Sequence, residues 1–181
     1  MIKIGVVGHR DLKIESISDY RKQVSKILQY LLRKHDDVTI YSALADGADR
    51  LVVEEGIKLG IEYISILPMH TKIYEIDFDN ISVINFYALL NKSKSVLTLP
   101  LINKNTIEGI QIYGEKRDLQ YEAAGHYISN NCNIMITLWD GKDTGLKGGT
   151  SETIKYFCSK SYFYLCFLFV SRENKLKNAK I

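Results

Sequence analysis

The chain has 181 residues, of which 46% are hydrophobic and 25% are charged, and its formal net charge is +3. This length fits one domain with a sizeable core, and the composition is typical of a soluble globular protein. So small a net charge argues against a nucleic-acid polymer as partner. The three cysteines have neither disulfide nor zinc-site spacing, which indicates reduced core residues in a cytoplasmic protein.

The two ends of the chain give no sign of a signal peptide or of membrane contact. The first residues enter a strand pattern at once, and the most apolar stretch, 161–170, is far shorter than the roughly 20 residues of a membrane span. We interpret 161–170 as a last buried strand. The tail 171–181 is polar and lysine-rich, so we expect it to be frayed and residues 1–170 to form a single domain.

Apolar runs and helical spacing alternate along the chain. Continuous apolar runs predict strands at 2–8, 38–43, 61–67, 95–99 and 133–139. Helical spacing predicts helices at 14–34, 48–59, 83–90 and 113–129 and another from Thr150, with an exposed loop over 101–112. Uniformly apolar strands that alternate with helices predict a Rossmann-like, doubly wound α/β domain. We expect a mostly parallel sheet of five to seven strands with helices on both faces.

The most informative segment follows the expected strand at 133–139. Four glycines lie between Trp139 and Thr150, where a helical pattern resumes with Glu152 in its first turn. Glycines let backbone N–H groups approach an anion, and the helix dipole adds to the attraction. A carboxylate beside a phosphate can accept hydrogen bonds from ribose hydroxyls or act as a general base. The segment predicts a nucleotide-like ligand; the plain alternative is a helix capped by Thr150.

Ligands of open parallel sheets bind at the carboxyl ends of the strands, so the residues just after each strand are the candidates. The ligand-binding residues that we expect are Gly8, His9, Arg10, Leu44, Asp46, Gly47, Asp49, Asp140, Gly141, Gly148, Gly149, Thr150 and Glu152. Arg10 can pair with phosphate in a bidentate manner, whereas Asp49 can equally be a structural helix cap. Histidines such as His35 have no metal-ligand spacing, so we expect neither a metal nor a cofactor.

Three motifs, in this order, resemble those of the SLOG superfamily. Gly8-His9-Arg10 and the run from Ser42 to Asp49 are similar to the G-S-R and S-G-x-A-x-G-x-D patterns of DprA-like members. The run from Gly148 to Glu152 is similar to the P-G-G-x-G-T-x-E motif of the LOG enzymes. The resemblance covers residues 2–158, and it implies a Rossmann-like fold that binds nucleotides or their derivatives.

The resemblance implies two leading functions, and a third, nucleic-acid binding in the DprA manner, is disfavoured by the net charge of +3. The first is binding of a nucleotide-derived small molecule, such as a cyclic or ADP-ribose-type signalling nucleotide, in bacterial anti-phage defence or its evasion. The second is a LOG-like N-glycosidase acting on nucleoside monophosphates, with Glu152 and Arg117 as the catalytic residues. Departures from the LOG loop at Trp139-Asp140-Gly141 favour the first. Both carry the expectation of a homo-oligomer with no nucleic-acid polymer bound.

Overall fold

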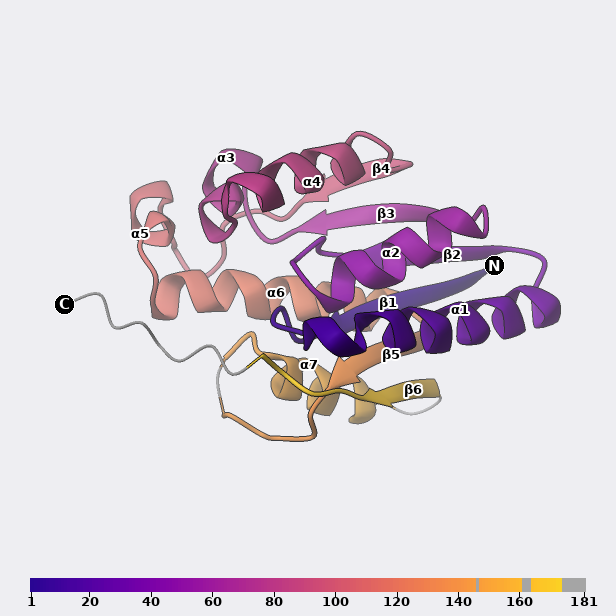
Figure 1. Ribbon diagram of the computed structural model, residues 1–181. Coiled ribbons are helices and arrows are strands. Elements are labelled where there is room, and N and C mark those ends of the chain that lie inside the picture. Colours follow the sequence, from indigo (N-terminus) through magenta and orange to yellow (C-terminus); the bar gives the residue numbers. More distant parts are fainter. Residues whose placement is uncertain (146, 161–163, 174–181) are drawn as a thin grey trace.

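The computed structural model describes residues 1–145, 147–160 and 164–173, and a six-stranded sheet lies at its centre (Figure 1). The strands are β1 (Ile2–Gly8), β2 (Val38–Ser42), β3 (Glu62–Leu67), β4 (Ser95–Thr98), β5 (Ile134–Trp139) and β6 (Tyr164–Phe169). They lie in the order β4-β3-β2-β1-β5-β6, and every pairing between them is parallel. This arrangement confirms the expected Rossmann-like α/β class.

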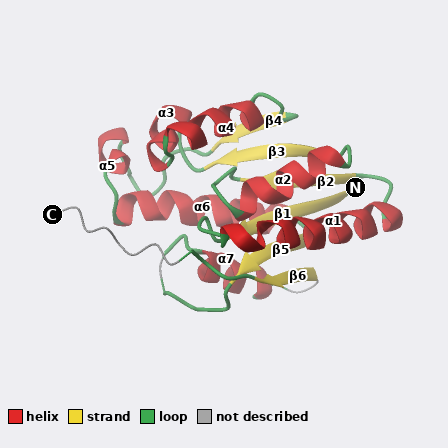
Figure 2. Cartoon of the chain, viewed as in Figure 1, coloured by secondary structure: helices red, strands yellow, loops and turns green. Residues whose placement is uncertain are grey.

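Helices cover both faces of the sheet (Figures 1 and 2). One face carries α1 (Ile17–Lys34), α2 (Ala48–Lys58) and α4 (Asn80–Leu90), and the other carries α6 (Glu115–Asn131) and α7 (Thr150–Cys158). Short helical turns lie in the connections: η1 (Ile14–Ser16), α3 (Thr71–Tyr74), η2 (Glu75–Asp77) and α5 (Ile107–Gln111). Strands and helices therefore form the three layers of a doubly wound domain.

Two apolar cores lie between these layers. In the larger, Val24 of α1, Val52 of α2 and Phe86 of α4 have no exposed surface. In the smaller, Ile128 of α6 and Phe157 of α7 pack in the same cluster as β5. The larger core follows from the sequence, because the buried residues of α1 recur every three to four positions.

The strand order reverses beside β1. The chain builds β2, β3 and β4 outward from one side of β1 and then returns to place β5 against the other side. Loops that leave the carboxyl ends of β1 and β5 therefore run to opposite faces of the sheet, which opens a crevice between them. The backbone N–H of His9 donates to the carbonyl of Leu138 at 3.0 Å, so the two loops begin side by side.

Two expectations about elements are wrong. Segment 101–112 is not simply an exposed loop, because it contains α5, whose Ile110 is completely buried. Strand β6 is not buried, since it lies at the edge of the sheet, with β5 as its one strand neighbour, and Tyr164 and Phe169 are exposed. Residues 161–163 of the expected last strand lie outside the described residues.

The beginning of the tail is held against the domain instead of being frayed. Arg172 donates to the Asp11 carboxylate at 2.9 Å, and the Glu173 carboxylate accepts from the backbone N–H of Ile14 at 2.8 Å. Residues 174–181 lie outside the described residues. All three cysteines are free, but Cys132 alone is fully buried. None of the helices in the described ranges is long and apolar enough to cross a membrane.

Candidate functional site

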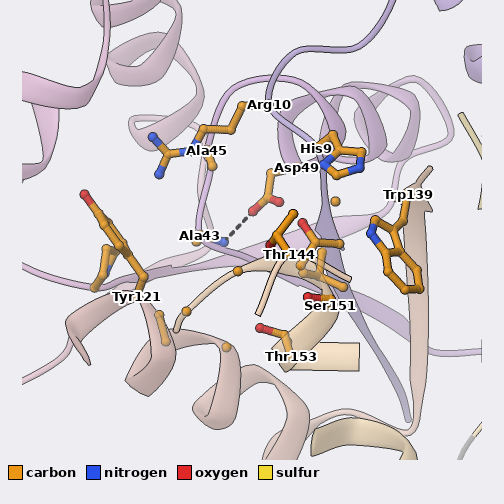
Figure 3. Close-up of a pocket in the computed structure, with 18 of the residues that line it drawn as sticks. His9, Arg10, Ala43, Ala45, Asp49, Tyr121, Trp139, Thr144, Ser151 and Thr153 are labelled. Atoms are coloured by element: carbon orange, nitrogen blue, oxygen red, sulfur yellow. Dashed lines mark hydrogen bonds between the residues drawn. The ribbon is translucent and has the colours of Figure 1, made fainter. Parts of the chain in front are cut away.

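A cavity of about 480 Å³ opens at the carboxyl edge of the sheet, where the strand order reverses (Figure 3). Its walls come from the loops after β1, β2 and β5, from α6 and from the first turn of α7. Of the residues expected to bind ligand, the structure brings seven to its lining: Gly8, His9, Arg10, Asp49, Gly148, Gly149 and Thr150. They converge because the carboxyl ends of parallel strands lie along one edge of the sheet. That they bind a ligand stays a prediction.

Asp49 projects from the start of α2 toward the middle of the cavity (Figure 3) and is only 5% exposed. Its carboxylate accepts hydrogen bonds from the Ser42 hydroxyl at 2.8 Å and from the Ala43 backbone N–H at 3.0 Å. Burial raises the pKa of Asp49 to about 6, although these two hydrogen bonds act in the opposite direction. The cavity therefore holds a carboxylate that can take up a proton in mildly acidic solution.

Arg10 forms one wall of the cavity, and it comes from the loop after β1. Its guanidinium lies over the ring of Tyr121, 5.5 Å from the centroid, and donates to Asp77 at 3.3 Å. The Asp77 carboxylate also accepts from the Tyr121 hydroxyl at 2.7 Å. Because the Arg10 side chain remains 41% exposed, it can pair with an incoming anion without leaving these partners.

The first turn of α7 forms the opposite wall. Gly149 occupies the cap position, and among the described residues no side chain caps this helix, so Thr150 is not the cap that the plain alternative required. The first backbone N–H groups of the helix consequently have no partner within it. They belong to the turn that contains the lining residues Thr150 and Ser151. A helix start of this kind attracts anionic groups such as phosphate.

Gly148 allows this helix start to sit where it does. Its φ is +65°, and a side chain there would lie 2.7 Å from the Asp118 carbonyl oxygen and 2.8 Å from the Glu122 backbone nitrogen. Glycine is therefore needed both for the backbone conformation and for close packing of the loop on α6. Gly8 has a comparable role, since a side chain there would lie 2.6 Å from the Leu138 carbonyl oxygen.

Leu44, Asp46 and Gly47 of the loop after β2 lie outside the lining, although their neighbours Ala43 and Ala45 belong to it. Leu44 is buried with a φ of +57°, and Asp46 pairs with Arg50 at 2.7 Å and accepts from Ser82 at 2.5 Å. Gly47, with a φ of +74°, lies against the backbone carbonyls of His9 and Arg10. Asp46 thus links α2 to α4 and Gly47 packs on the loop after β1, while the role of these residues in ligand binding stays a prediction.

Asp140 and Gly141 of the loop after β5 also lie outside the lining. His9 Nε2 and the Asp140 carboxylate are 2.8 Å apart, which joins the loops after β1 and β5. Gly141 has a φ of +78° and lies against the ring of Phe169. Asp140 therefore contacts the lining residue His9, whereas Phe169, which lies against Gly141, is not a lining residue.

The two expected catalytic residues do not reach the cavity. Arg117 is completely buried, and its guanidinium donates to the Ile110 carbonyl, the Ile73 carbonyl and the Asp77 carboxylate at 2.5, 3.0 and 2.7 Å. It joins α6 to the segments before it. Glu152 is outside the lining, and its carboxylate lies 2.8 Å from His126 Nε2. This geometry gives no support to a hydrolytic site built from this pair.

The expected ligand-binding residues did not include several cationic and aromatic lining residues: Tyr113, Tyr121, Trp139, Lys142, Lys147 and Arg172. Lys142 and Lys147 lie among the glycines of the same loop, which is a signal that could have been used. Arg172 lies in the tail, where nothing in the sequence indicates that it returns to the sheet edge.

The sheet order and the cavity at its reversal point define a Rossmann-like domain, and solved structures of this class are similar to it. DNA processing protein A (DprA) from Streptococcus pneumoniae matches with a TM-score of 0.53 and 15% identity over 91% of this chain and 58% of that protein. DprA from Helicobacter pylori matches with a TM-score of 0.55 and 15% identity over 96% and 67%. The H. pylori structure is described by its single-stranded DNA binding mode. The chain thus spans less than two thirds of the S. pneumoniae protein.

No family model matches the sequence, and no curated protein matches it either. The DprA-like fold expected from the SLOG resemblance is confirmed, whereas its nucleotide-sensor branch has no support. Because the matching structures are DprA proteins, one of them described as binding single-stranded DNA, the expected small-molecule function in anti-phage defence is wrong. The N-glycosidase alternative is not supported, and excluding a nucleic-acid polymer was also wrong. The expected homo-oligomer gains no support from these comparisons.

Proposed function

We propose that this domain binds single-stranded nucleic acid, and single-stranded DNA in particular, at the carboxyl edge of its sheet. The observation that carries the proposal is that cationic side chains, aromatic side chains and an uncapped helix start line one open cavity. Proteins that bind single strands without sequence preference combine these same elements. The similarity of the fold to DprA, described in one case by its single-stranded DNA binding, supports the same interpretation.

Phosphate groups would be held by four lining cations: Arg10, Lys142, Lys147 and Arg172. Lys142 and Lys147 are exposed, while Arg10 and Arg172 are each 41% exposed at the side chain. The start of α7 adds backbone N–H groups to this set. Affinity for phosphate depends on such a local cluster, which a net charge of +3 over the whole chain does not reveal.

Bases would stack on the aromatic side chains of the lining. Tyr113 is 66% exposed, and Trp139 and Tyr121 lie on opposite sides of the cavity (Figure 3). Stacking of a base on an aromatic ring contributes about 1–3 kcal/mol and needs an unpaired base with a free face. A duplex hides those faces between its stacked pairs, so the concave, aromatic lining favours a single strand.

Fluorescence anisotropy with a labelled oligothymidine tests this proposal. We expect saturable binding, weaker binding of the matched duplex, and a loss of affinity of about 10- to 100-fold for Arg10→Ala, since a hydrogen bond to a charged group contributes about 1.5–3 kcal/mol. Lys26→Ala is the matched control, because Lys26 is an exposed cation on α1 outside the cavity lining. Equal affinities of wild type and Arg10→Ala, or a preference for the duplex, would contradict the proposal.

We also propose that the chain belongs to the SLOG superfamily, that residues 1–170 form its binding domain, and that the protein is cytoplasmic. The order of the three motifs and the DprA-like fold support membership on the DprA side of the superfamily. One sheet supports a single binding domain over 1–170, to which the lining residue Arg172 adds the start of the tail. Three free cysteines support a cytoplasmic setting.

A further inference from the structure

Glu122 and His126 of α6 and Glu152 of α7 form a cluster next to the cavity, although none of the three lines it. One ligand atom of each lies within 4.8 Å of the other two, and His126 Nε2 is 2.8 Å from a carboxylate oxygen of Glu152. We propose that this triad binds a divalent first-row transition-metal ion that joins α6 to α7.

The donor set suits such an ion. Glu122 and His126 are four residues apart on one helix, so they share a face, and Glu152 approaches that face from the neighbouring helix. One imidazole and two carboxylates are ligands that Mn²⁺, Fe²⁺ and Zn²⁺ accept. Two ligand atoms 2.8 Å apart fit one ion at bond lengths of about 2.1 Å, so modest side-chain movement closes the triad.

A second observation also indicates a missing cation. One carboxylate oxygen of Glu152 faces His126, but the other is shielded from solvent and has no hydrogen-bond donor among the described residues. Buried carboxylate oxygens are normally paired with a donor or coordinate a metal. The ion pair with His126 explains the first oxygen and leaves the second unexplained, and a bound cation would satisfy both.

The imidazole is held in position for this role. The ring of His126 stacks on Tyr156 of α7 with 3.7 Å between centroids and 23° between planes. Stacking restricts the rotation of the ring and keeps Nε2 directed toward Glu152. Ligands fixed by surrounding contacts lose less freedom when the ion binds.

The ion would also steady the wall of the cavity, because Glu152 directly follows the lining residue Ser151. The inference does not rest on the proposed function, however. If the chain binds metal but no DNA, the metal-site proposal stands and the DNA-binding proposal fails. If it binds DNA but no metal, only the metal-site proposal fails.

Titration calorimetry of the purified chain with Mn²⁺ tests the proposal. Mn²⁺ is chosen because it binds thiolates weakly, so the three free cysteines do not compete for it. We expect one ion per chain and a rise in melting temperature on its addition. Glu122→Gln should weaken binding at least tenfold and abolish that rise, and it leaves the contact between His126 and Glu152 in place.

Glu115→Gln is the control, because Glu115 lies on the same helix and pairs with Lys147 outside the triad. It should bind Mn²⁺ as wild type does. The proposal is overturned if wild type shows no saturable binding at millimolar Mn²⁺. It is equally overturned if Glu122→Gln retains wild-type affinity, because the ion then lies elsewhere.

Discussion

Asp49 combines a structural role in the loop after β2 with a position that faces the cavity. The residue begins α2 next to the loop after β2, and the sequence allowed both a helix cap and a ligand-binding residue there. In the structure its carboxylate accepts from Ser42 and Ala43, so it organises that loop while it also faces the cavity. Both roles are compatible, because a carboxylate has two oxygens and accepts several hydrogen bonds.

We expect the free energy of unfolding to depend on pH through the Asp49 carboxyl. The pKa of Asp49 is about 6 in the folded chain against an ordinary value of 3.8, mainly because of burial, so the folded state binds the proton more tightly. Its contribution to the free energy of unfolding is therefore full below pH 3.8 and is lost as the pH rises through about 6. The loss is about 1.4 kcal/mol per pH unit, on the order of 3 kcal/mol in all.

Urea unfolding of wild type and Asp49→Asn at several pH values measures this contribution. Asparagine keeps an acceptor oxygen for Ser42 and Ala43 but cannot titrate, so the difference in unfolding free energy between the two proteins should change across that window. Other titrating groups cancel in the difference. A difference that stays constant between about pH 4 and pH 7 would show that the Asp49 carboxyl is not perturbed.

At the scale of single residues, the sequence predicted which residues lie at the cavity better than it predicted what each residue contacts. Gly8, Arg10 and Gly149 lie at the cavity because each follows a strand or opens a helix, which pattern alone reveals. Arg117 could not be predicted in the same way. Its burial depends on α5 and on the turn before α4, and those segments carry no periodic signal that shows where they pack.

At the scale of elements, continuous apolar runs located the strands closely. Strand β2 was expected at 38–43 and occupies Val38–Ser42, since its five residues are all buried. Pattern could not reveal the exposure of β6, which depends on how many strands lie beside it. The His126–Glu152 contact was missed as well, because it joins two helices; the spacing of Glu122 and His126 on one helix was a usable signal.

The loop before α7 offers a test of how this element is positioned. Gly148→Ala should cost about 1–3 kcal/mol of stability and weaken oligothymidine binding, because its side chain would collide with the backbone of α6 and displace the helix start. Gly145→Ala is the matched control: its φ of +64° is also positive, but nothing lies within 4 Å of an added side chain. Gly145→Ala therefore carries only the backbone strain of about 1 kcal/mol.

Thermal unfolding and anisotropy, measured on both variants, separate the two effects. Collision with α6 predicts that Gly148→Ala loses more stability and more affinity than Gly145→Ala. If the two variants behave alike, backbone conformation alone governs this loop, and its packing on α6 has no influence on the helix start.

At the scale of the whole molecule, the fold gathers charges that are far apart in the sequence. Arg10 follows β1, Lys142 and Lys147 follow β5, and Arg172 follows β6, yet all four line the same cavity. Parallel strands produce this result, because their carboxyl ends lie along one edge of the sheet. The net charge sums these cations with every acidic residue of the chain, of which Asp11, Asp49 and Asp118 line the same cavity, so it does not reveal where the cations gather.

The salt dependence of oligothymidine binding tests the central claim most directly. Each phosphate contact on a single strand contributes about −0.7 to the slope of log affinity against log salt, so three to four lining cations predict a slope of about −2 to −3. Arg10→Ala should reduce the magnitude of that slope by about 0.7, whereas Lys26→Ala should leave it unchanged. An affinity that does not depend on salt, or an Arg10→Ala slope equal to that of wild type, would contradict binding of the strand in this cavity.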